Sequence, residues 1–128
     1  MFVQGGSFFV LYSLDIVKTH NFWKELDCKI LEIEQEKLVV SVCDFELHYI
    51  YSESEQVEKY KYITLNKTNY GNGVIFYLQT ENLEIAKEKI IKAGGNLKSE
   101  IFVNHWGGEE LLFEEPSGFK FVAYHINS

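Results

Sequence analysis

Cysteine and basic residues are scarce in this sequence, and long apolar runs are missing. Cys28 and Cys43 belong to no Cys-x-x-Cys pair and no zinc-spaced cluster, so we expect reduced thiols in a cytoplasmic compartment. No run reaches the roughly 18 apolar residues of a membrane-spanning helix. The stretch from Met1 to Leu14 has no basic segment and reaches Asp15 early, so we expect no targeting signal.

The shortage of positive charge bears on possible partners. The 12 Lys and Arg residues are outnumbered by 19 Asp and Glu residues, which gives a net charge of −7. No basic cluster could follow a phosphate backbone, so we expect neither a nucleic-acid nor a membrane partner. A negative field favours neutral or cationic small molecules, although an acidic balance more commonly serves only to keep a protein soluble.

Aromatic residues, in contrast, are abundant. The chain has 10 Phe, 8 Tyr and 2 Trp, and 46% of its 128 residues are hydrophobic. A chain of this length and composition buries a core without disulfides or metal ions. We therefore predict a single domain over residues 1–128, with aromatic side chains left over to line a pocket.

The order of predicted elements occurs twice along the chain. In the first half, a strand at 8–12 and the helix cap Asp15 precede an amphipathic helix at 16–26, and extended segments follow at 29–34, 37–42 and 45–51. In the second half, a strand at 73–78 and the cap Asn82 precede a helix at 83–93 that stops at Gly94, and extended segments follow at 98–103, 110–114 and 119–125. The caps lie 67 residues apart, which indicates a tandem duplication.

This repeat predicts an α+β fold made of two tandem βαβββ modules. The modules span about 7–52 and about 73–126, and the polar, turn-rich segment of about 53–72 reads as a linker. A ferredoxin-like α+β barrel is the competing interpretation. It requires two strands per helix, whereas the pattern here has four.

Three short motifs resemble those of one known superfamily. They are the aromatic pair Phe22-Trp23 in the first helix, the tripeptide 106–108 (Trp-Gly-Gly) and the tetrapeptide 115–118 (Glu-Pro-Ser-Gly). The chain is similar over nearly its whole length to the vicinal oxygen chelate superfamily, which includes glyoxalase I, extradiol dioxygenases, fosfomycin-resistance transferases and bleomycin-resistance proteins. The resemblance implies a curved mixed sheet around a concave cavity, helices on the outside, and a homodimer.

The resemblance also implies four positions for a metal ion. Metalloenzymes of the superfamily use a His or Gln in the first strand of each module and a Glu near the end of each module's last strand. Counted from the caps and the final turn, these positions are Phe8, Ile75, Val122, and His48 or Glu46. Three of the four are apolar and have no lone pair to donate, so we predict no metal and no cofactor. We interpret His48 as a pocket or surface histidine.

Strand alternation selects the side chains that would face the cavity. Phe9 and Leu11 should pack under the helices, and their neighbours in sequence should point the other way. Trp106 is added because the superfamily's Trp-Gly segment often borders the cavity. The predicted ligand-binding residues are therefore Tyr12, Glu46, His48, Tyr77, Gln79, Trp106 and Tyr124. Aromatic residues on a sheet are more often core than binding site, which is the alternative interpretation.

These observations favour a metal-free binding protein of the glyoxalase and bleomycin-resistance type. It would sequester a neutral or cationic aromatic compound, such as an antibiotic. One alternative is a glyoxalase-like lyase or isomerase with an atypical metal site, and another is an interaction module with no ligand. Glu46 and Glu110 would serve as acid and base only if both faced inward, and the sequence has no nucleophile elbow and no Walker loop, so it indicates no catalytic residue.

Overall fold

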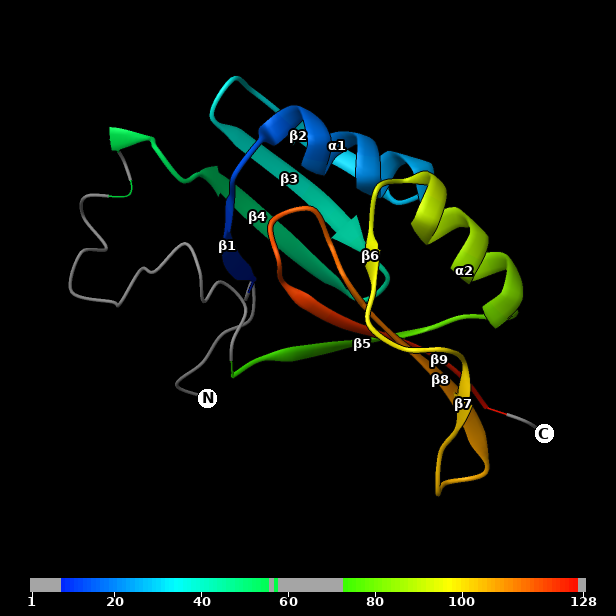
Figure 1. The fold of residues 1–128 in the computed structure, drawn as a ribbon. Helices are drawn as coiled ribbons and strands as arrows, with labels where there is room; N and C mark the ends of the chain where they lie inside the picture. The colour runs from blue at the N-terminus through cyan, green and yellow to red at the C-terminus, as the bar shows by residue number, and fades with distance from the viewer. Residues whose placement is uncertain (1–7, 56, 58–72, 127–128) are drawn as a thin grey trace.

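The computed structural model describes residues 8–55, 57 and 73–126, so most of the predicted linker at 53–72 lies outside the described residues. Two helices lie on one side of two mixed β-sheets (Figure 1). The first module contains β1 (Phe9–Ser13), α1 (Ile16–Glu25), β2 (Lys29–Ile33), β3 (Lys37–Val42) and β4 (Phe45–Tyr51). The second contains β5 (Ile75–Gln79), α2 (Leu83–Lys92), β6 (Asn96–Leu97), β7 (Phe102–Val103), β8 (Gly108–Glu114) and β9 (Lys120–Ile126).

Both helices begin where their capping residues predict. The side chain of Asp15 accepts a hydrogen bond from the Lys18 amide at 3.0 Å, and that of Asn82 accepts one from the Ile85 amide at 3.0 Å. Each cap thereby provides a partner for an amide that has none within the first turn of its helix. Within the described part of the chain, neither helix is both long and apolar enough to cross a membrane.

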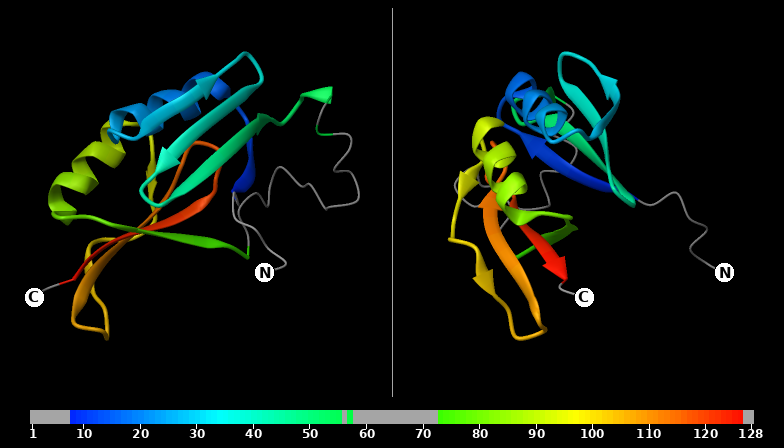
Figure 2. Two further views of the ribbon diagram at one scale, coloured as in Figure 1. Left: turned by 180° about the vertical axis from the view of Figure 1, so that it is seen from behind. Right: turned by 90° about the vertical axis from the view of Figure 1, so that its right-hand side faces the viewer.

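The two sheets have the same topology. Their strand orders are β1-β4-β3-β2 and β5-β9-β8-β6, and β7 also pairs with β8. In each module the first strand runs parallel to the last, and the other pairs are antiparallel. The tandem modules predicted from the sequence are therefore confirmed, and the ferredoxin-like interpretation is wrong because four strands accompany α1. Figure 2 shows from two further sides that the sheets do not close on themselves.

The single strand predicted at 98–103 is wrong in extent, because only its last two residues form a strand, β7, and the short strand β6 ends before it at Leu97. Both pair with β8, but the segment between them bonds differently. The amide of Lys98 donates to the carbonyl of Leu112 at 2.8 Å, whereas the amide of Leu112 donates to the hydroxyl of Ser99 at 2.9 Å. Because a serine side chain replaces a main-chain acceptor here, the ladder is interrupted.

Both modules contribute to the hydrophobic core. Trp23 of α1 is fully buried and contacts Phe121 of β9, with ring centroids 5.2 Å apart. Phe22 of the same helix lies 6.3 Å from the ring of Phe113 in β8. Because α1 packs on strands of the other module, the halves share one core. This sharing supports a single domain over residues 1–128, which stays a prediction.

The turn between β8 and β9 carries a buried carboxylate. One oxygen of Glu115 accepts hydrogen bonds from the amides of Ser117 and Phe119, at 2.8 and 2.9 Å. The other carboxylate oxygen accepts a hydrogen bond from the Tyr49 hydroxyl at 3.1 Å, and this hydroxyl in turn accepts one from the indole N–H of Trp23 at 3.0 Å. Burial raises the pKa of Glu115 to about 7, although these hydrogen bonds act in the opposite direction. The Glu-Pro-Ser-Gly turn thus ties the modules together.

Candidate functional site

Strand alternation correctly separates most of the exposed face from the core. In β1, Leu11 is buried, whereas Val10 is exposed and stands opposite His48 in the parallel ladder. The prediction for Phe9 was wrong, because its ring is 48% exposed and does not pack under a helix. It contacts Phe76 edge-on at 5.3 Å instead. Phe9 is the first residue of an edge strand, where aromatic side chains of other strands provide its apolar contacts.

The predicted residues on the first sheet form one group. The imidazole of His48 lies 3.0 Å from a carboxylate oxygen of Glu46. The ring of Phe8 stacks on the same imidazole, with centroids 3.8 Å apart and planes 14° from parallel. Tyr12 lies on β1 and is partly buried. His48 is therefore hydrogen-bonded to a carboxylate and covered by an aromatic ring.

This donor set does not fit a divalent metal ion. Phe8, which holds one counted ligand position, covers His48 with a hydrocarbon ring. Ile75 and Val122 lie on the second sheet and offer no lone pair. Among residues 8–55, 57 and 73–126, no three His, Cys, Asp or Glu side chains gather closely enough to hold a metal. We derive no chemistry through a metal at this site.

A second group gathers aromatic rings at one end of the second sheet. The ring of Tyr77 lies 5.8 Å from that of Tyr124 and 6.2 Å from that of Trp106. These three side chains, together with Asn104, Gly108 and Ile126, line a hollow of about 340 Å³. Tyr77 is 44% and Trp106 is 64% exposed. We call the three rings the aromatic cluster.

The loop that holds Trp106 is organised by Asn104. The Asn104 side-chain oxygen accepts hydrogen bonds from the amides of Trp106 and Gly108, at 3.0 and 2.9 Å. Gly107 has a φ of +87°, which a glycine adopts without steric cost. At Gly108, an added Cβ would lie 2.5 Å from the carbonyl oxygen of His125. The sequence analysis missed Asn104, although an Asn two residues before the turn is a recognised signal for such a loop.

Glu110 lies beside the aromatic cluster. It is only 6% exposed, and it stands directly opposite Tyr124 in the antiparallel ladder, so both side chains are on one face of the sheet. The side-chain amide of Asn104 donates to one of its oxygens at 3.0 Å. Glu46 lies on the other sheet and pairs with His48. The arrangement therefore does not support Glu46 and Glu110 as an acid and base pair.

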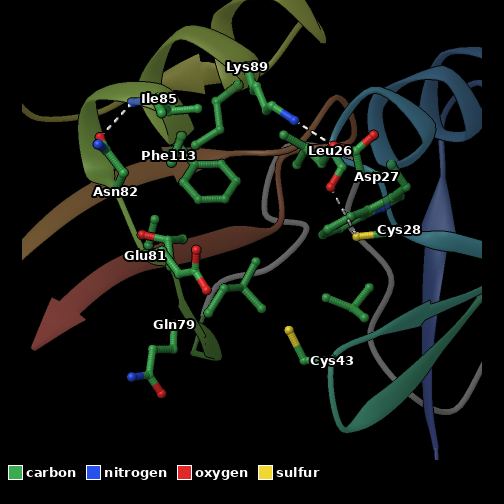
Figure 3. A pocket seen from close by; sticks show the side chains of 17 residues that line it. Leu26, Asp27, Cys28, Cys43, Gln79, Glu81, Asn82, Ile85, Lys89 and Phe113 are labelled. Atoms are coloured by element: carbon green, nitrogen blue, oxygen red, sulfur yellow. Dashed lines mark hydrogen bonds and ion pairs between the residues drawn. The ribbon is translucent and has the colours of Figure 1, made fainter.

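Two more hollows lie elsewhere on the molecule. One, of about 520 Å³, follows the second sheet and includes Ile75 and Val122. The other, of about 480 Å³, lies between the modules on the helix side and includes Cys28, Cys43 and Gln79 (Figure 3). The pKa of the Cys28 thiol is raised to about 11, chiefly by burial and to a smaller extent by the neighbouring Cys43.

The seven predicted residues therefore do not form one compact site. Glu46 contacts His48 on the first sheet, whereas Tyr77, Trp106 and Tyr124 form the aromatic cluster on the second. Gln79 is exposed at the end of β5, where it stands opposite Tyr124 but also borders the hollow between the modules.

Comparison with known proteins agrees with the fold. No family model matches the chain, and no curated protein matches its sequence. A hypothetical protein from S. aureus superposes with a TM-score of 0.81 at 22% identity, covering 96% of this chain and 94% of that one. A glyoxalase-related enzyme from Fulvimarina pelagi gives 0.81 at 13% identity, covering 96% and 88%.

The Tn5 bleomycin resistance determinant also superposes. Its TM-score is 0.65 at 14% identity, and the match covers 98% of this chain and 100% of that one. At such identities the likeness concerns the fold alone. The shared topology, the duplicated module and these neighbours show that the chain has the fold of the vicinal oxygen chelate superfamily.

Proposed function

We propose that the protein binds an organic small molecule at the aromatic cluster of its second sheet and needs no metal to do so. The observation that carries this proposal is a group of three neighbouring rings around a hollow of about 340 Å³, in which Tyr77 and Trp106 are exposed and Tyr124 is half-buried. Aromatic rings supply contact area at little entropic cost, and a few polar groups then fix the orientation of a ligand. The neighbour named as a bleomycin resistance determinant makes sequestration of a drug-like compound a reasonable role.

The competing interpretation of these rings as core is less consistent with their exposure. Phe121, on the neighbouring strand β9, is 1% exposed and packs toward the helices. Trp106 is 64% exposed although it is among the largest apolar side chains of the protein. Leaving an indole in water has no folding benefit. A function outside the core explains its position better.

Binding should be tested by following the emission of Trp106. In a Trp23→Phe variant, Trp106 is the remaining tryptophan, so a panel of neutral and cationic aromatic compounds, bleomycin included, can be titrated against its fluorescence. We expect at least one compound to shift the emission saturably. Stacking on an indole contributes roughly 0.5–1.5 kcal/mol beyond area burial, so Trp106→Ala should weaken that compound several-fold in calorimetry. No shift at millimolar concentration, or equal binding after Trp106→Ala, would contradict the proposal.

A homodimer is the second part of the proposal. The exposed faces of both sheets carry large apolar side chains, among them Phe8 (50% exposed) and Ile75 (60% exposed). A second copy that placed one module against the other module of its partner would cover them and enclose the ligand. Light scattering at micromolar concentration should give about twice the 14.9 kDa of one chain. A mass of one chain would leave each hollow open on a monomer.

Metal content separates this function from a glyoxalase-like lyase or isomerase. Because Phe8, Ile75 and Val122 donate no lone pair, protein purified without chelator should carry no stoichiometric Ni, Zn, Mn or Fe in elemental analysis. About one equivalent of metal that is lost in His48→Ala would favour the lyase instead. We also expect the protein to act in the cytoplasm, because its two cysteines belong to no disulfide.

A further inference from the structure

Glu110 is a buried carboxylate with no positive partner in the part of the chain that the structure describes. The residue is only 6% exposed. No Lys, Arg or His among the described residues forms an ion pair with it. Its one hydrogen bond in that part of the chain comes from the neutral side-chain amide of Asn104. Acidic side chains are rarely this buried unless they are paired, because burial removes the water that solvates the charge. A buried anion of this kind suits a cation that comes from outside the chain.

The second oxygen of Glu110 remains within reach of a ligand. Asn104 donates to Oε2, and Oε1 has no hydrogen bond to a described residue. No side-chain nitrogen or oxygen in the described residues is both sealed from solvent and without a partner. Oε1 therefore keeps some solvent-accessible surface, although the residue as a whole is buried.

The surroundings of this oxygen are those of a cation site. Tyr124 stands directly opposite Glu110 on the same face of the sheet, and its ring contacts Tyr77, which contacts Trp106. Asn104 lines the aromatic hollow and also holds the Glu110 carboxylate, so it connects the two. The faces of Trp and Tyr rings attract an organic cation through their quadrupoles, and a nearby carboxylate adds Coulombic attraction.

We propose that the hollow of the aromatic cluster takes the cationic nitrogen of the ligand, as a substituted ammonium group attached to an aromatic body, and that the carboxylate of Glu110, held by the lining residue Asn104, attracts this charge. This inference rests on the proposed function, because it places the ligand at the same hollow. It narrows the ligand class from neutral or cationic compounds to cations. The tetrahedral cation would contact the faces of the rings, while the carboxylate of Glu110, beside the lining residues Asn104 and Tyr124, would balance its charge.

The test uses two probes that differ in charge but hardly in shape. They are para-hydroxyphenyl-trimethylammonium and its neutral carbon isostere, para-tert-butylphenol, each titrated into the full chain by calorimetry. We expect the cation to bind at least about tenfold more tightly than the isostere. In Glu110→Gln, which keeps the size and an acceptor for Asn104, that preference should fall to about threefold or less while the isostere binds as before.

Glu109→Gln is the matched control. Glu109 is the neighbour of Glu110 in β8, faces the opposite side of the sheet by alternation, and its substitution removes the same formal charge. It should keep the preference of the unmodified protein. A preference lost equally in both variants would show only the effect of net charge and would overturn the inference.

Three other outcomes would also overturn the inference: equal binding of the two probes, an unchanged preference in Glu110→Gln, or no binding of either probe. The proposed function fails separately, in the broader panel that monitors Trp106. If a neutral compound binds there and is weakened by Trp106→Ala, the binding function stands although the cationic class is wrong. Circular dichroism of each variant excludes a folding defect as the cause.

Discussion

The buried carboxylate of Glu115 makes the stability of this fold depend on pH. Its pKa is raised from the ordinary value of 4.5 to about 7, chiefly by burial. The folded state therefore holds a proton that the unfolded state releases between these two values. The contribution is fully present below pH 4.5 and is lost as the pH rises to about 7. At about 1.4 kcal/mol per pH unit, the difference amounts to ~3 kcal/mol of unfolding free energy.

Glu115→Gln isolates this contribution. The glutamine keeps an oxygen that accepts the amides of Ser117 and Phe119, but it does not titrate. Both proteins should be denatured with urea at a series of pH values from 4.5 to 8. As the pH rises, the free energy of unfolding of the unmodified protein should fall by ~3 kcal/mol relative to that of Glu115→Gln. Glu109→Gln, which removes an acidic side chain from β8 outside this network, should stay parallel to the unmodified protein.

Two results would refute the reasoning about Glu115. The first is a difference between the unmodified protein and Glu115→Gln that stays constant within about 1 kcal/mol across this pH range. The second is a difference of the opposite sign, with the unmodified protein gaining relative stability as the pH rises. The first would mean that the three hydrogen bonds to the carboxylate balance the cost of its burial, and the second that they outweigh it.

Two further predictions follow from local geometry. Gly108→Ala should lower the free energy of unfolding by about 1–3 kcal/mol in urea denaturation, because the added Cβ would lie 2.5 Å from the carbonyl oxygen of His125. An unchanged midpoint would contradict this prediction and would show that β9 can move away at no cost. Iodoacetamide at neutral pH should modify the exposed Cys43 well before Cys28, whose pKa burial raises to about 11, and peptide mass spectrometry that found the reverse order would contradict the burial of Cys28.

Much of the fold could be predicted because its signals are local. The caps Asp15 and Asn82 lie next to the helices they start, and the 67-residue repeat shows in the order of elements. Strand alternation placed Leu11 in the core correctly. The gap between β6 and β7 was missed because it depends on the hydroxyl of Ser99, which accepts a hydrogen bond from β8, and no periodicity in the sequence records such a contact.

The candidate site was harder to predict because its contacts are distant in sequence. Tyr77 and Tyr124 were selected by parity, and their contact with Trp106 is a tertiary feature. The role of Asn104 in the loop had a sequence signal that was overlooked. The position of Glu110 had no such signal, because the lack of a cationic partner among the described residues appears only once the strands are paired. The same holds for Glu115, whose partner Tyr49 lies 66 residues away.

The most direct test of the account is to locate a bound ligand on the molecule. Backbone amide NMR of the labelled protein, titrated with para-hydroxyphenyl-trimethylammonium, reports which residues respond. The account predicts that the largest shifts fall on the second sheet, around Tyr77, Tyr124 and the loop of Asn104 and Trp106. Shifts concentrated around Cys28 and Cys43, in the hollow between the modules (Figure 3), or no shifts at millimolar concentration, would contradict it.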